Sequence, residues 1–505
     1  MSKKKVTLTN EYQQDLFEGT EYATKKSVEY TEEQKEFIEF NGKESIVLAA
    51  TAGSGKSFSC VQRLNYLIKN GVDPNRIIFF SFTKAATEEL IERVKKEGIN
   101  VREKISGKNE NGVSITTIHS FANSLLARMG KFKKIATFNE FLVWFGKKYK
   151  PSSYATKEAK ESFYELLSNM YDESEQLSSS IGAFKLQSAD NIKTPIPKYL
   201  NEYKTFLKET RSRDFSDILI EVRDLLRENK WIKMFRNKYD YIFIDEYQDT
   251  STIQLQILLS LNANSYYMIG DRNQSIYGYS GANCKKLEQM LKKRREVKEL
   301  SLSTNFRSDK LIIENSNKYS SLIATPKSKE NGSVNKKIMI RMGELIELLK
   351  QPGEVVVLVR TNDIIKKLEK ELLKRKVPMK YFNFITDEDI KNFKKGDINN
   401  QLRGKLNNFV GHFENDTQLI SFIEKFKNSK KFITTIHKSK GREFDECIVV
   451  NSISPDVLKE CNIYDKVGKK RLERISFTDI DEEAKNIHYV AVSRPKHKLH
   501  FMIYE

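Results

Sequence analysis

The chain has 505 residues, of which 39% are hydrophobic and 31% are charged, and its formal net charge is +19. This length exceeds a single hydrophobic core and predicts two or more domains, while the longest apolar runs, such as Tyr241 to Ile244, are far too short to span a membrane. The positive charge favours a polyanionic partner, nucleic acid before a lipid surface, because the basic clusters at 292–295 and 469–471 flank no amphipathic anchor.

Neither the first residues nor the cysteines indicate an exported protein. The amino terminus is positively charged but lacks the apolar segment of a secretory signal. No two cysteines form a Cys-x-x-Cys pair, so we expect thiols of a reducing compartment and no disulfide or zinc framework. The four cysteines are Cys60, Cys284, Cys447 and Cys461.

Residues 1–30 are polar and lack periodicity, so we expect a loosely held extension. Thr31 and Gln34 then form a capping-box pattern at the start of a short helix. A glutamine shortly before a phosphate loop can bind the adenine edge, because its amide offers both a donor and an acceptor. An ordinary surface glutamine is the alternative at this position.

The stretch from Ser45 to Ser57 has the pattern of a nucleotide-binding loop. A short buried strand at 46–49 runs into a loop of small residues, and a helical run follows directly. Glycines let backbone N–H groups approach phosphates, Lys56 reaches the β and γ oxygens, and the Ser57 hydroxyl suits Mg²⁺. Ala50 stands where the usual pattern has its first glycine, and a flexible glycine turn is the alternative. The predicted nucleotide-binding residues are Ala52, Gly53, Ser54, Gly55, Lys56 and Ser57.

Several apolar strands end in polar clusters. Ligands of doubly wound α/β sheets bind at the carboxyl ends of strands, so we expect these clusters to converge. Asp245 and Glu246 directly follow their strand: Asp245 would hold Mg²⁺ together with Ser57, and Glu246 would orient or deprotonate the attacking water. A solvated acidic turn is the alternative. The predicted strands are 77–80, 113–115, 241–244 and 266–269.

The periodicity changes between His119 and about Arg213, which predicts an inserted, mostly helical segment. Apolar residues from Phe163 to Tyr171 recur at helical spacing, and we expect them to form core rather than to touch a cofactor. A second sheet is expected after Ala282. Its elements are strands at 354–360, 431–436 and 447–450, a helix at 363–376, and a last strand with Leu499, Phe501 and Ile503.

Some arginines and aromatic residues have two interpretations each. Arg307 and Arg494 lie beyond the first sheet, from where an arginine can reach the γ-phosphate and raise the rate by about 10³–10⁵. By spacing alone, an average arginine of this basic chain is more often a surface residue. Aromatic rings among polar clusters can stack on bases, at roughly 1–3 kcal/mol each, or simply pack. The aromatic residues in such places are Phe82, Phe121, Tyr277 and Tyr279.

Together these clusters resemble, in order, the motifs of the superfamily 1 DNA helicases of the UvrD/Rep/PcrA type. The resemblance covers about residues 31–121, 211–310, 354–362 and 431–505. The matching stretches are Gln34, AATAGSGKS, SFTKAATEEL, TTIHSFA, DEYQD, GDRNQSIYGYSGA, LSTNFRS, TTIHKSKGREFD and HYVAVSRPK.

The resemblance implies a role for each matching residue. Gln34 would contact adenine and Phe306 would stack on it, while Glu443 would contact the ribose. Gln274 would sense the γ-phosphate. Two arginine fingers would complete the catalytic set, which is Lys56, Asp245, Glu246, Gln274, Arg307 and Arg494. The DNA-contacting residues would be Phe82, Thr83, His119, Phe121, Tyr277, Tyr279, Thr435 and His437.

The implied fold is α/β, with two RecA-like P-loop domains on parallel sheets, a mostly helical insertion in the first and a reduced insertion in the second. The second insertion is reduced because only Asp309 to Ile433 separates the two motifs that flank it. Tyr279, Ser280 and Pro495 depart from the residues usual in the family. The expected domains are an extension at 1–30, the first RecA-like domain at 31–121 and 211–282, the helical insertion at 122–210, the second RecA-like domain at 283–385 and 430–505, and the reduced insertion at 386–429.

The resemblance implies an ATP- and Mg²⁺-dependent DNA helicase that moves 3′ to 5′ on single-stranded DNA, in repair or replication. A DNA-binding ATPase clamp, a helicase of 5′ to 3′ polarity and a small-molecule phosphotransferase are the alternatives. The expected partners are single-stranded DNA and single–double-strand junctions, with no membrane, and a protein loading partner is left open. We expect a monomer in the cytoplasm of a bacterial or phage-infected cell.

Overall fold

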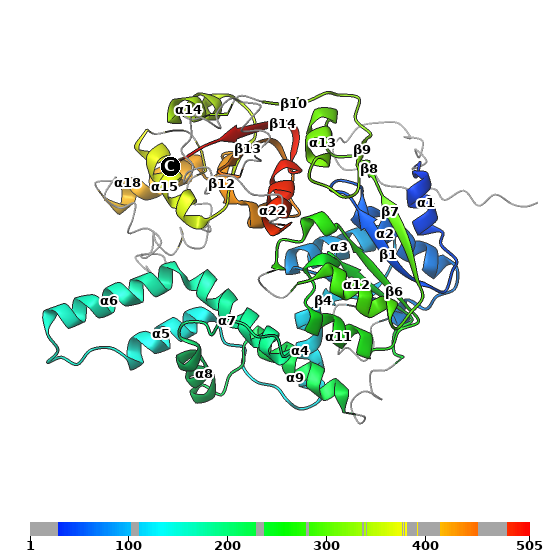
Figure 1. The fold of residues 1–505 in the computed structure, drawn as a ribbon, viewed down its shortest axis with the longest axis horizontal. Coiled ribbons are helices and arrows are strands. Elements are labelled where there is room, and N and C mark those ends of the chain that lie inside the picture. Colours follow the sequence, from blue (N-terminus) through cyan, green and yellow to red (C-terminus); the bar gives the residue numbers. More distant parts are fainter. Residues whose placement is uncertain are drawn as a thin grey trace, which may run out of the picture.

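The computed structural model describes residues 29–102, 111–228, 237–278, 282–335, 338–339, 341–375, 377, 379–380, 391, 415–452 and 482–504. Most of the expected extension at 1–30, most of the expected insertion at 386–429, the cluster at 469–471 and Tyr279 lie outside these residues. Within them the chain forms two lobes, each built around a parallel sheet (Figure 1). No helix in these ranges is both long and apolar enough to cross a membrane.

The first lobe contains a seven-stranded sheet in the order β3-β4-β2-β5-β6-β1-β7, with every neighbouring pair parallel. Its central strands are buried on both faces, which explains their continuous apolar sequences. The bounds are β1 Ser45–Ala50, β2 Ile77–Ser81, β3 Val101–Arg102, β4 Val113–Thr117, β5 Tyr241–Asp245, β6 Ser265–Gly270 and β7 Val297–Leu302.

Helices cover both faces of this sheet. Alternate strand residues serve the two cores: Ile78 and Phe80 pack on one side, and Ile77 and Phe79 on the other. The first core includes α4 Ile118–Arg128, α9 Phe215–Arg227, α11 Thr252–Ser260 and α12 Cys284–Lys292. The second includes α1 Glu32–Ile38, α2 Lys56–Lys69 and α3 Lys84–Lys96.

The predicted boundary between the two domains at 282/283 is wrong. Strand β7 pairs with β1 over its whole length, so the first sheet continues to Leu302. Leu300 and Leu302 enter the same core as β1, and α12 covers the opposite face. Helix α12 and strand β7, which follow β6, therefore belong to the first lobe, and the second lobe starts after them.

A separate helical body projects from the first lobe (Figure 1). Its own core includes Met170, which is 1% exposed, with Phe163 packed against it, as the helical spacing predicts. Tyr171, which was also expected in this core, is instead 39% exposed, because it falls outside the buried face of its helix. The body is shorter than the predicted insertion at 122–210, because α4 belongs to the core of the first lobe down to Met129. Its helices are α5 Phe138–Lys148, α6 Lys157–Asp172, α7 Ser174–Ala189 and α8 Leu200–Glu209.

The second lobe has a five-stranded parallel sheet in the order β10-β14-β13-β11-β12. The strand predicted at 354–360 is β11, and the helix predicted at 363–376 is α15. The strands are β10 Ser333–Val334, β11 Val355–Val359, β12 Lys431–Thr435, β13 Phe444–Val450 and β14 Pro495–Met502. The helices are α13 Lys310–Asn317, α14 Met342–Lys350, α15 Asn362–Lys374, α18 Asp416–Phe426, α19 Ile436–Ser439 and α22 Glu482–Val492.

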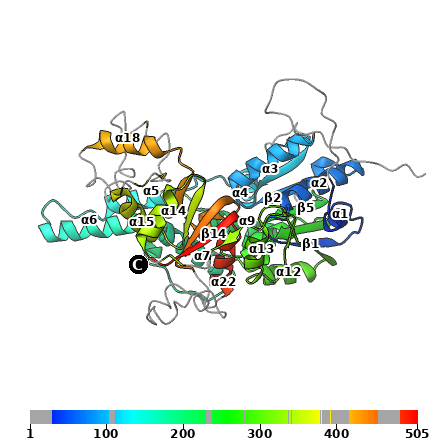
Figure 2. The ribbon, with the colours of Figure 1, turned by 90° about the horizontal axis from the view of Figure 1, so that it is seen from above.

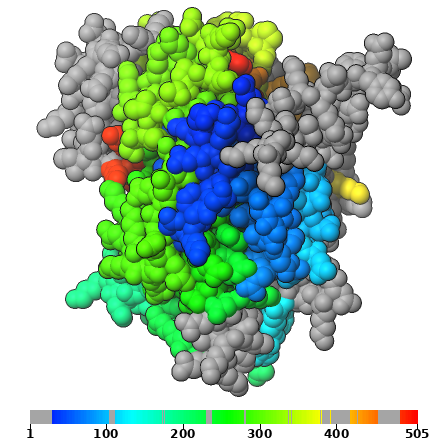
Figure 3. All heavy atoms as spheres, turned by 90° about the vertical axis from the view of Figure 1, so that its right-hand side faces the viewer, coloured from blue at the N-terminus to red at the C-terminus, as the bar shows by residue number. Residues whose placement is uncertain are grey.

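The two lobes lie side by side in both ribbon views (Figures 1 and 2). A short ladder of β8 Thr304–Asn305 with β9 Thr325–Pro326 lies at the connection between them. Helix α22 of the second lobe contacts η3, the 3-10 turn Arg272–Gln274 that follows β6. Figure 3 shows the first-lobe end of the molecule, where the dark-blue residues near the start of the described chain pack beside the light-blue part of the lobe.

Candidate active site

A cleft of about 810 Å³ lies between the lobes, at the carboxyl ends of the first-lobe strands. The predicted catalytic residues all line it, from both sides. From the first lobe these are Lys56, Asp245, Glu246 and Gln274, and from the connection and the second lobe they are Arg307 and Arg494. Side chains more than 400 residues apart in sequence therefore share one cavity, as the convergence of strand ends predicts.

The phosphate loop follows β1 and ends in the first turn of α2. Gly53 and Gly55 have φ values of 73° and 78°, a backbone region that favours glycine. A Cβ on Gly53 would lie 2.7 Å from Cβ of Arg307, so the loop also needs glycine for close packing. The Ser54 hydroxyl donates to the Thr51 carbonyl at 2.9 Å and closes the turn. Lys56 is the first residue of α2, where backbone N–H groups have no partner within the helix.

Gln34 and Phe306 meet beside this loop. The predicted capping box is present: the Thr31 backbone N–H donates to Gln34 Oε1 at 3.1 Å, and Gln34 N–H donates to the Thr31 hydroxyl at 3.2 Å. A Cβ on Gly55 would lie 3.3 Å from Nε2 of Gln34. The Phe306 N–H donates to the Gly53 carbonyl at 2.9 Å, and its ring is 46% exposed. The amide and the ring are thus placed next to the loop.

Asp245 and Glu246 lie at the end of β5, facing the loop lysine. Glu246 adopts φ 51°, a strained value for a residue with a side chain, and the Lys56 Nζ lies 3.7 Å from its Oε1. Burial and the Glu246 charge raise the pKa of Asp245. Burial also acts to raise the pKa of Glu246, but the ammonium groups of Lys56 and Lys440 outweigh it and lower that pKa. The pair therefore differs in proton affinity.

The site has the oxygen ligands that Mg²⁺ prefers. Ser57 and Asp245 both line the cleft beside the phosphate loop, and Asp245 Oδ1 accepts a hydrogen bond from the Glu246 N–H at 3.0 Å. No cluster of three or more metal-ligating side chains occurs among the described residues. A hydroxyl and a carboxylate suit Mg²⁺, which is commonly held by one or two protein oxygens together with water and substrate phosphates.

Arg494 reaches the cleft from the second lobe. It is 1% exposed, and its Nη2 donates to Oε1 of Gln274 at 3.3 Å across the lobes. Its Nε donates to the Val490 carbonyl at 3.0 Å. Burial, with the nearby Arg307 charge, lowers the pKa of Arg494 to about 10, so it remains a cation at neutral pH. Arg307 donates from Nε to Glu443 Oε2 at 2.6 Å, which brings the predicted finger and the predicted ribose contact together.

Lys440 is a cleft residue that the sequence analysis does not single out. Its Nζ lies 2.5 Å from Oδ2 of Asp249 and donates to the Gln274 carbonyl at 2.6 Å. Both partners belong to the first lobe, so this second-lobe lysine bridges the cleft. Burial raises the pKa of Asp249 to about 7 although Lys440 acts to lower it. The sequence offered one signal for Lys440. It lies in the stretch TTIHKSKGREFD, which begins at the end of a strand of the second sheet.

Three of the predicted DNA-contacting rings gather at the mouth of the cleft. Phe82 and Tyr277 have ring centroids 5.4 Å apart, and Tyr277 and His437 are 5.9 Å apart. The ammonium of Lys440 lies 5.5 Å from the Tyr277 centroid. Phe82 is 39% exposed, so its ring is open to a ligand. The two lobes therefore contribute to one aromatic surface. Thr83 and Thr435 are N-cap residues of α3 and α19, with Thr435 buried.

His119 touches Phe215 edge-on, at 5.6 Å between ring centroids. Phe215 is 55% exposed and was not predicted; its only sequence signal is an apolar residue at the exposed start of a helix. Burial lowers the pKa of His119 to about 4, so its ring is neutral at pH 7. The two rings form a second aromatic pair on the first lobe, in which Phe215 is exposed and His119 is half-buried.

The prediction that Phe121 contacts DNA is wrong. Its side chain is 1% exposed and packs edge-on against Phe80, at 5.3 Å, inside the core of the first lobe. On α4 it lies four residues before Leu125 and shares that helix's buried face. Tyr279, the remaining predicted contact, lies outside the described residues.

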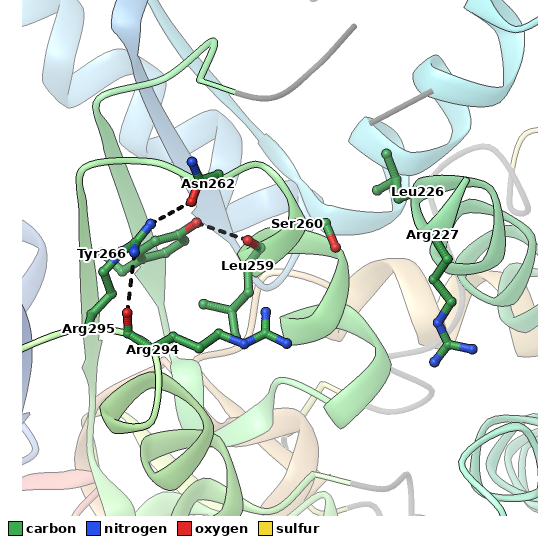
Figure 4. Close-up of a pocket in the computed structure, with 8 residues that line it drawn as sticks. All are labelled: Leu226, Arg227, Leu259, Ser260, Asn262, Tyr266, Arg294 and Arg295. Carbon is green, nitrogen blue, oxygen red and sulfur yellow. Dashed lines mark hydrogen bonds between the residues drawn. The ribbon is translucent and has the colours of Figure 1, made fainter. Parts of the chain in front are cut away.

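A smaller cavity of about 430 Å³ lies at the opposite edge of the first sheet (Figure 4). The helices α9, α11 and α12 end beside it. Basic side chains complement helix carboxyl termini, so these arginines have a structural reason to be there. The lining residues are Leu226, Arg227, Leu259, Ser260, Asn262, Tyr266, Arg294 and Arg295.

Comparison with known proteins gives consistent matches. Residues 30–295 match the model of the UvrD/REP helicase N-terminal domain, and residues 388–505 match that of the UvrD-like helicase C-terminal domain. The chain is similar to a probable DNA helicase II homolog of Mycoplasma capricolum, at 28% identity over 66% of this chain and 49% of that protein. It is also similar to the ATP-dependent DNA helicase Rep of Buchnera aphidicola, at 26% identity over 70% and 54%.

A third relative is the ATP-dependent DNA helicase PcrA of Staphylococcus aureus, at 26% identity over 54% of this chain and 37% of that protein. The chain spans about half the length of the curated relatives it matches, or less. The first family model alone covers more than half of the chain, from α1 to the end of α12.

Proposed function

The chain belongs to the UvrD/REP helicase family, and we propose that it is an ATP-dependent motor that moves along single-stranded DNA and separates duplex ahead of it. The observation that carries this proposal is the shared cleft, in which the first-lobe loop residue Lys56 and the second-lobe residue Arg494 line one cavity. A site completed by two lobes can couple the state of a nucleotide to the distance between them.

The roles proposed for the cleft residues follow from their placement. The loop N–H groups and Lys56 bind the phosphates, and Gln34 and Phe306 lie where an adenine would fit beside the loop. Ser57 and Asp245 would hold Mg²⁺, which neutralises charge on the phosphates when bound. Glu246 orients the attacking water, and Arg307 and Arg494 stabilise the charge that develops on the transferred phosphoryl group.

The proposed DNA path crosses both lobes at the cleft mouth. Phe82 from the first lobe and His437 from the second both contact Tyr277, so a change in lobe spacing would alter the surface that holds the bases. The basic charge of the chain supplies phosphate contacts that do not depend on sequence. By family resemblance we propose movement from 3′ to 5′, by a monomer. The relatives above are all bacterial, which supports a bacterial or phage-infected cell as the setting.

The test is unwinding of matched duplexes that carry either a 3′ or a 5′ single-stranded tail, with and without ATP. We expect ATP-dependent strand separation of the 3′-tailed duplex and little of the 5′-tailed one. Separation of only the 5′-tailed duplex would reverse the polarity, and DNA-stimulated ATP hydrolysis without separation would make the protein a clamp. Lys56→Ala is the control: we expect loss of hydrolysis by at least about a hundredfold, and full activity in it would remove the site assignment.

A further inference from the structure

Gln248, in the turn after β5, is fully buried and contacts the proposed catalytic base. Its Nε2 donates to Oε2 of Glu246, and its Oε1 accepts a hydrogen bond from the Asp271 N–H at 3.2 Å. A backbone N–H can only donate, so the amide oxygen must face Asp271 and the NH₂ group must face Glu246. The side chain therefore bridges two turns of the first lobe, the turn after β5 and the turn after β6.

The last residue of β6 is shaped around this bridge. A Cβ on Gly270 would lie 2.0 Å from Oε1 of Gln248 and 2.8 Å from the Tyr247 ring, so only glycine allows the turn to close on the strand. Because the contact is this tight, Gln248 cannot shift on its own when the Asp271 turn moves. Movement of the turn after β6 is therefore transmitted to the turn after β5.

The turn at Asp271 is itself hydrogen-bonded to the second lobe. Asp271 Oδ2 accepts from the Tyr489 hydroxyl at 3.1 Å and from Nε2 of Gln274 at 2.9 Å. Gln274 Oε1 accepts from Nη2 of Arg494 at 3.3 Å. Tyr489 and Arg494 lie on α22 and just beyond it, in the second lobe. Hydrogen bonds thus run without a gap from the second lobe, through Asp271 and Gln248, to Glu246.

We propose that Gln248 is a positioning residue that couples the arrangement of the two lobes to the orientation of Glu246. The proposal rests on the proposed function, in which Glu246 orients the attacking water. When the second lobe draws Asp271 toward the closed arrangement, Gln248 holds Glu246 in its productive place; when the lobes separate, that hold weakens. Hydrolysis is then confined to the closed state, although the phosphate loop binds ATP in both.

The neighbouring Tyr247 provides a matched control in the same turn. Its hydroxyl donates to Oε1 of Glu288 at 2.5 Å, and Arg272 donates to the same carboxylate with Nε at 2.7 Å. Tyr247 is as buried as Gln248, at 0% exposed, but its hydroxyl bonds to α12 and not to Glu246. Loss of that bond disturbs the packing of the turn while it leaves the bridge in place.

The experiment measures steady-state ATP hydrolysis with saturating single-stranded DNA for Gln248→Met, Gln248→Glu and Tyr247→Phe. We expect kcat to fall about tenfold or more in both Gln248 variants, with KM for ATP within about twofold of wild type, since a misplaced base costs rate and not phosphate binding. The Glu variant keeps an acceptor for the Asp271 N–H but repels Glu246. Tyr247→Phe should lower the melting temperature and keep kcat. Equal kcat values in Gln248→Glu and wild type would overturn the proposal.

A double-mutant cycle tests the coupling itself. Tyr489→Phe removes the second-lobe bond to Asp271, and we expect its loss in kcat not to add to that of Gln248→Met, because the two changes break one chain of bonds. Losses that multiply would show independent roles and overturn the coupling. If neither Gln248 variant folds, kcat and KM for ATP are measured in Tyr489→Phe instead. An unchanged kcat in that variant rejects the proposal. A wild-type protein without DNA-stimulated hydrolysis would instead contradict the proposed function.

Discussion

Two cavities, at opposite edges of the first sheet, are both lined by arginines, but the arginines differ in burial and in partners. At the carboxyl edge of the sheet, Arg494 is 1% exposed, comes from the other lobe and donates to Gln274. At the amino edge, Arg294 is exposed and extends from the end of α12 toward the gap beside α9, where Arg227 is 65% exposed (Figure 4). Arg494 is buried, where charge costs most, whereas Arg294 and Arg227 are solvated.

This difference teaches that charge type alone does not mark a functional site. A buried cation is retained only where something compensates its desolvation. At the carboxyl edge the compensating groups are carboxylates and the Gln274 amide of the first lobe, together with backbone carbonyls of the second lobe. At the amino edge the charges complement helix termini within one lobe. Substitutions at the two edges should therefore differ in kind: loss of catalysis at one, and small losses of stability at the other.

The largest effect is expected for Arg494→Ala. Removal of an arginine that stabilises the transferred phosphoryl group costs about 10³-fold in rate or more, and Arg494→Lys should restore little, because an ammonium lacks the planar fork of donors. Single-turnover ATP hydrolysis with DNA present measures the loss, and thermal melting checks that the buried position still folds. A loss below about tenfold in Arg494→Ala would break the comparison, since the second lobe would then contribute no finger.

Next in size is Phe82→Ala at the cleft mouth. Its ring is 39% exposed and 5.4 Å from Tyr277, and stacking of a base on such a ring is worth roughly 1–3 kcal/mol. We expect about a tenfold weaker affinity for single-stranded DNA, measured by fluorescence anisotropy with an oligothymidine. Phe132→Ala is the control, because Phe132 is 74% exposed and lines neither cavity. An equal loss of DNA affinity in both variants would show that exposed aromatic residues bind DNA regardless of their position in the fold.

Asp249→Asn is expected to change folding stability, and its effect depends on pH. Burial raises the pKa of Asp249 from 3.8 to about 7, so the folded state holds this proton more tightly than the unfolded state. The resulting stabilisation is full below about pH 4 and is lost as the pH rises through 7, an effect on the order of 3 kcal/mol between pH 5 and pH 8. Asparagine does not titrate. Urea unfolding at pH 5 and pH 8 should show a flatter dependence in the variant; parallel curves would contradict the raised pKa.

The sequence predicted features that depend on neighbouring residues better than contacts between residues that are distant in sequence. The phosphate loop, the carboxylates after β5 and the cap at Thr31 are set by neighbouring residues, and each was found where the pattern placed it. Strand β7 was missed because its sequence VKELSL leaves two consecutive residues exposed and makes sense only once it is paired with β1. The prediction for Phe121 was wrong because its neighbours in the motif are polar and indicate exposure, whereas its helix buries the ring in the core.

The remaining misses are contacts between distant residues. Nothing in the spacing of DEYQD pairs Asp249 with Lys440, which lies 191 residues further on. The link from Gln248 to the Asp271 N–H likewise depends on β5 and β6 being neighbours in the sheet. A sequence pattern shows which residues end at one edge of a sheet, but the partners that they find there depend on how the second lobe docks.

The smallest effect is expected at the amino edge, for Arg294→Ala. Its charge lies two residues beyond the end of α12, where complementing the helix terminus contributes about 0.3–1 kcal/mol. Arg295→Ala should cost more stability, because its Nη2 donates to Asn262 Oδ1 at 2.7 Å and to the Ala263 carbonyl at 3.1 Å. Neither should change ATP hydrolysis or DNA affinity, measured beside thermal melting. A fall in DNA affinity beyond about threefold in Arg294→Ala, with the melting temperature unchanged, would make the amino-edge cavity a binding site and remove the contrast between the edges.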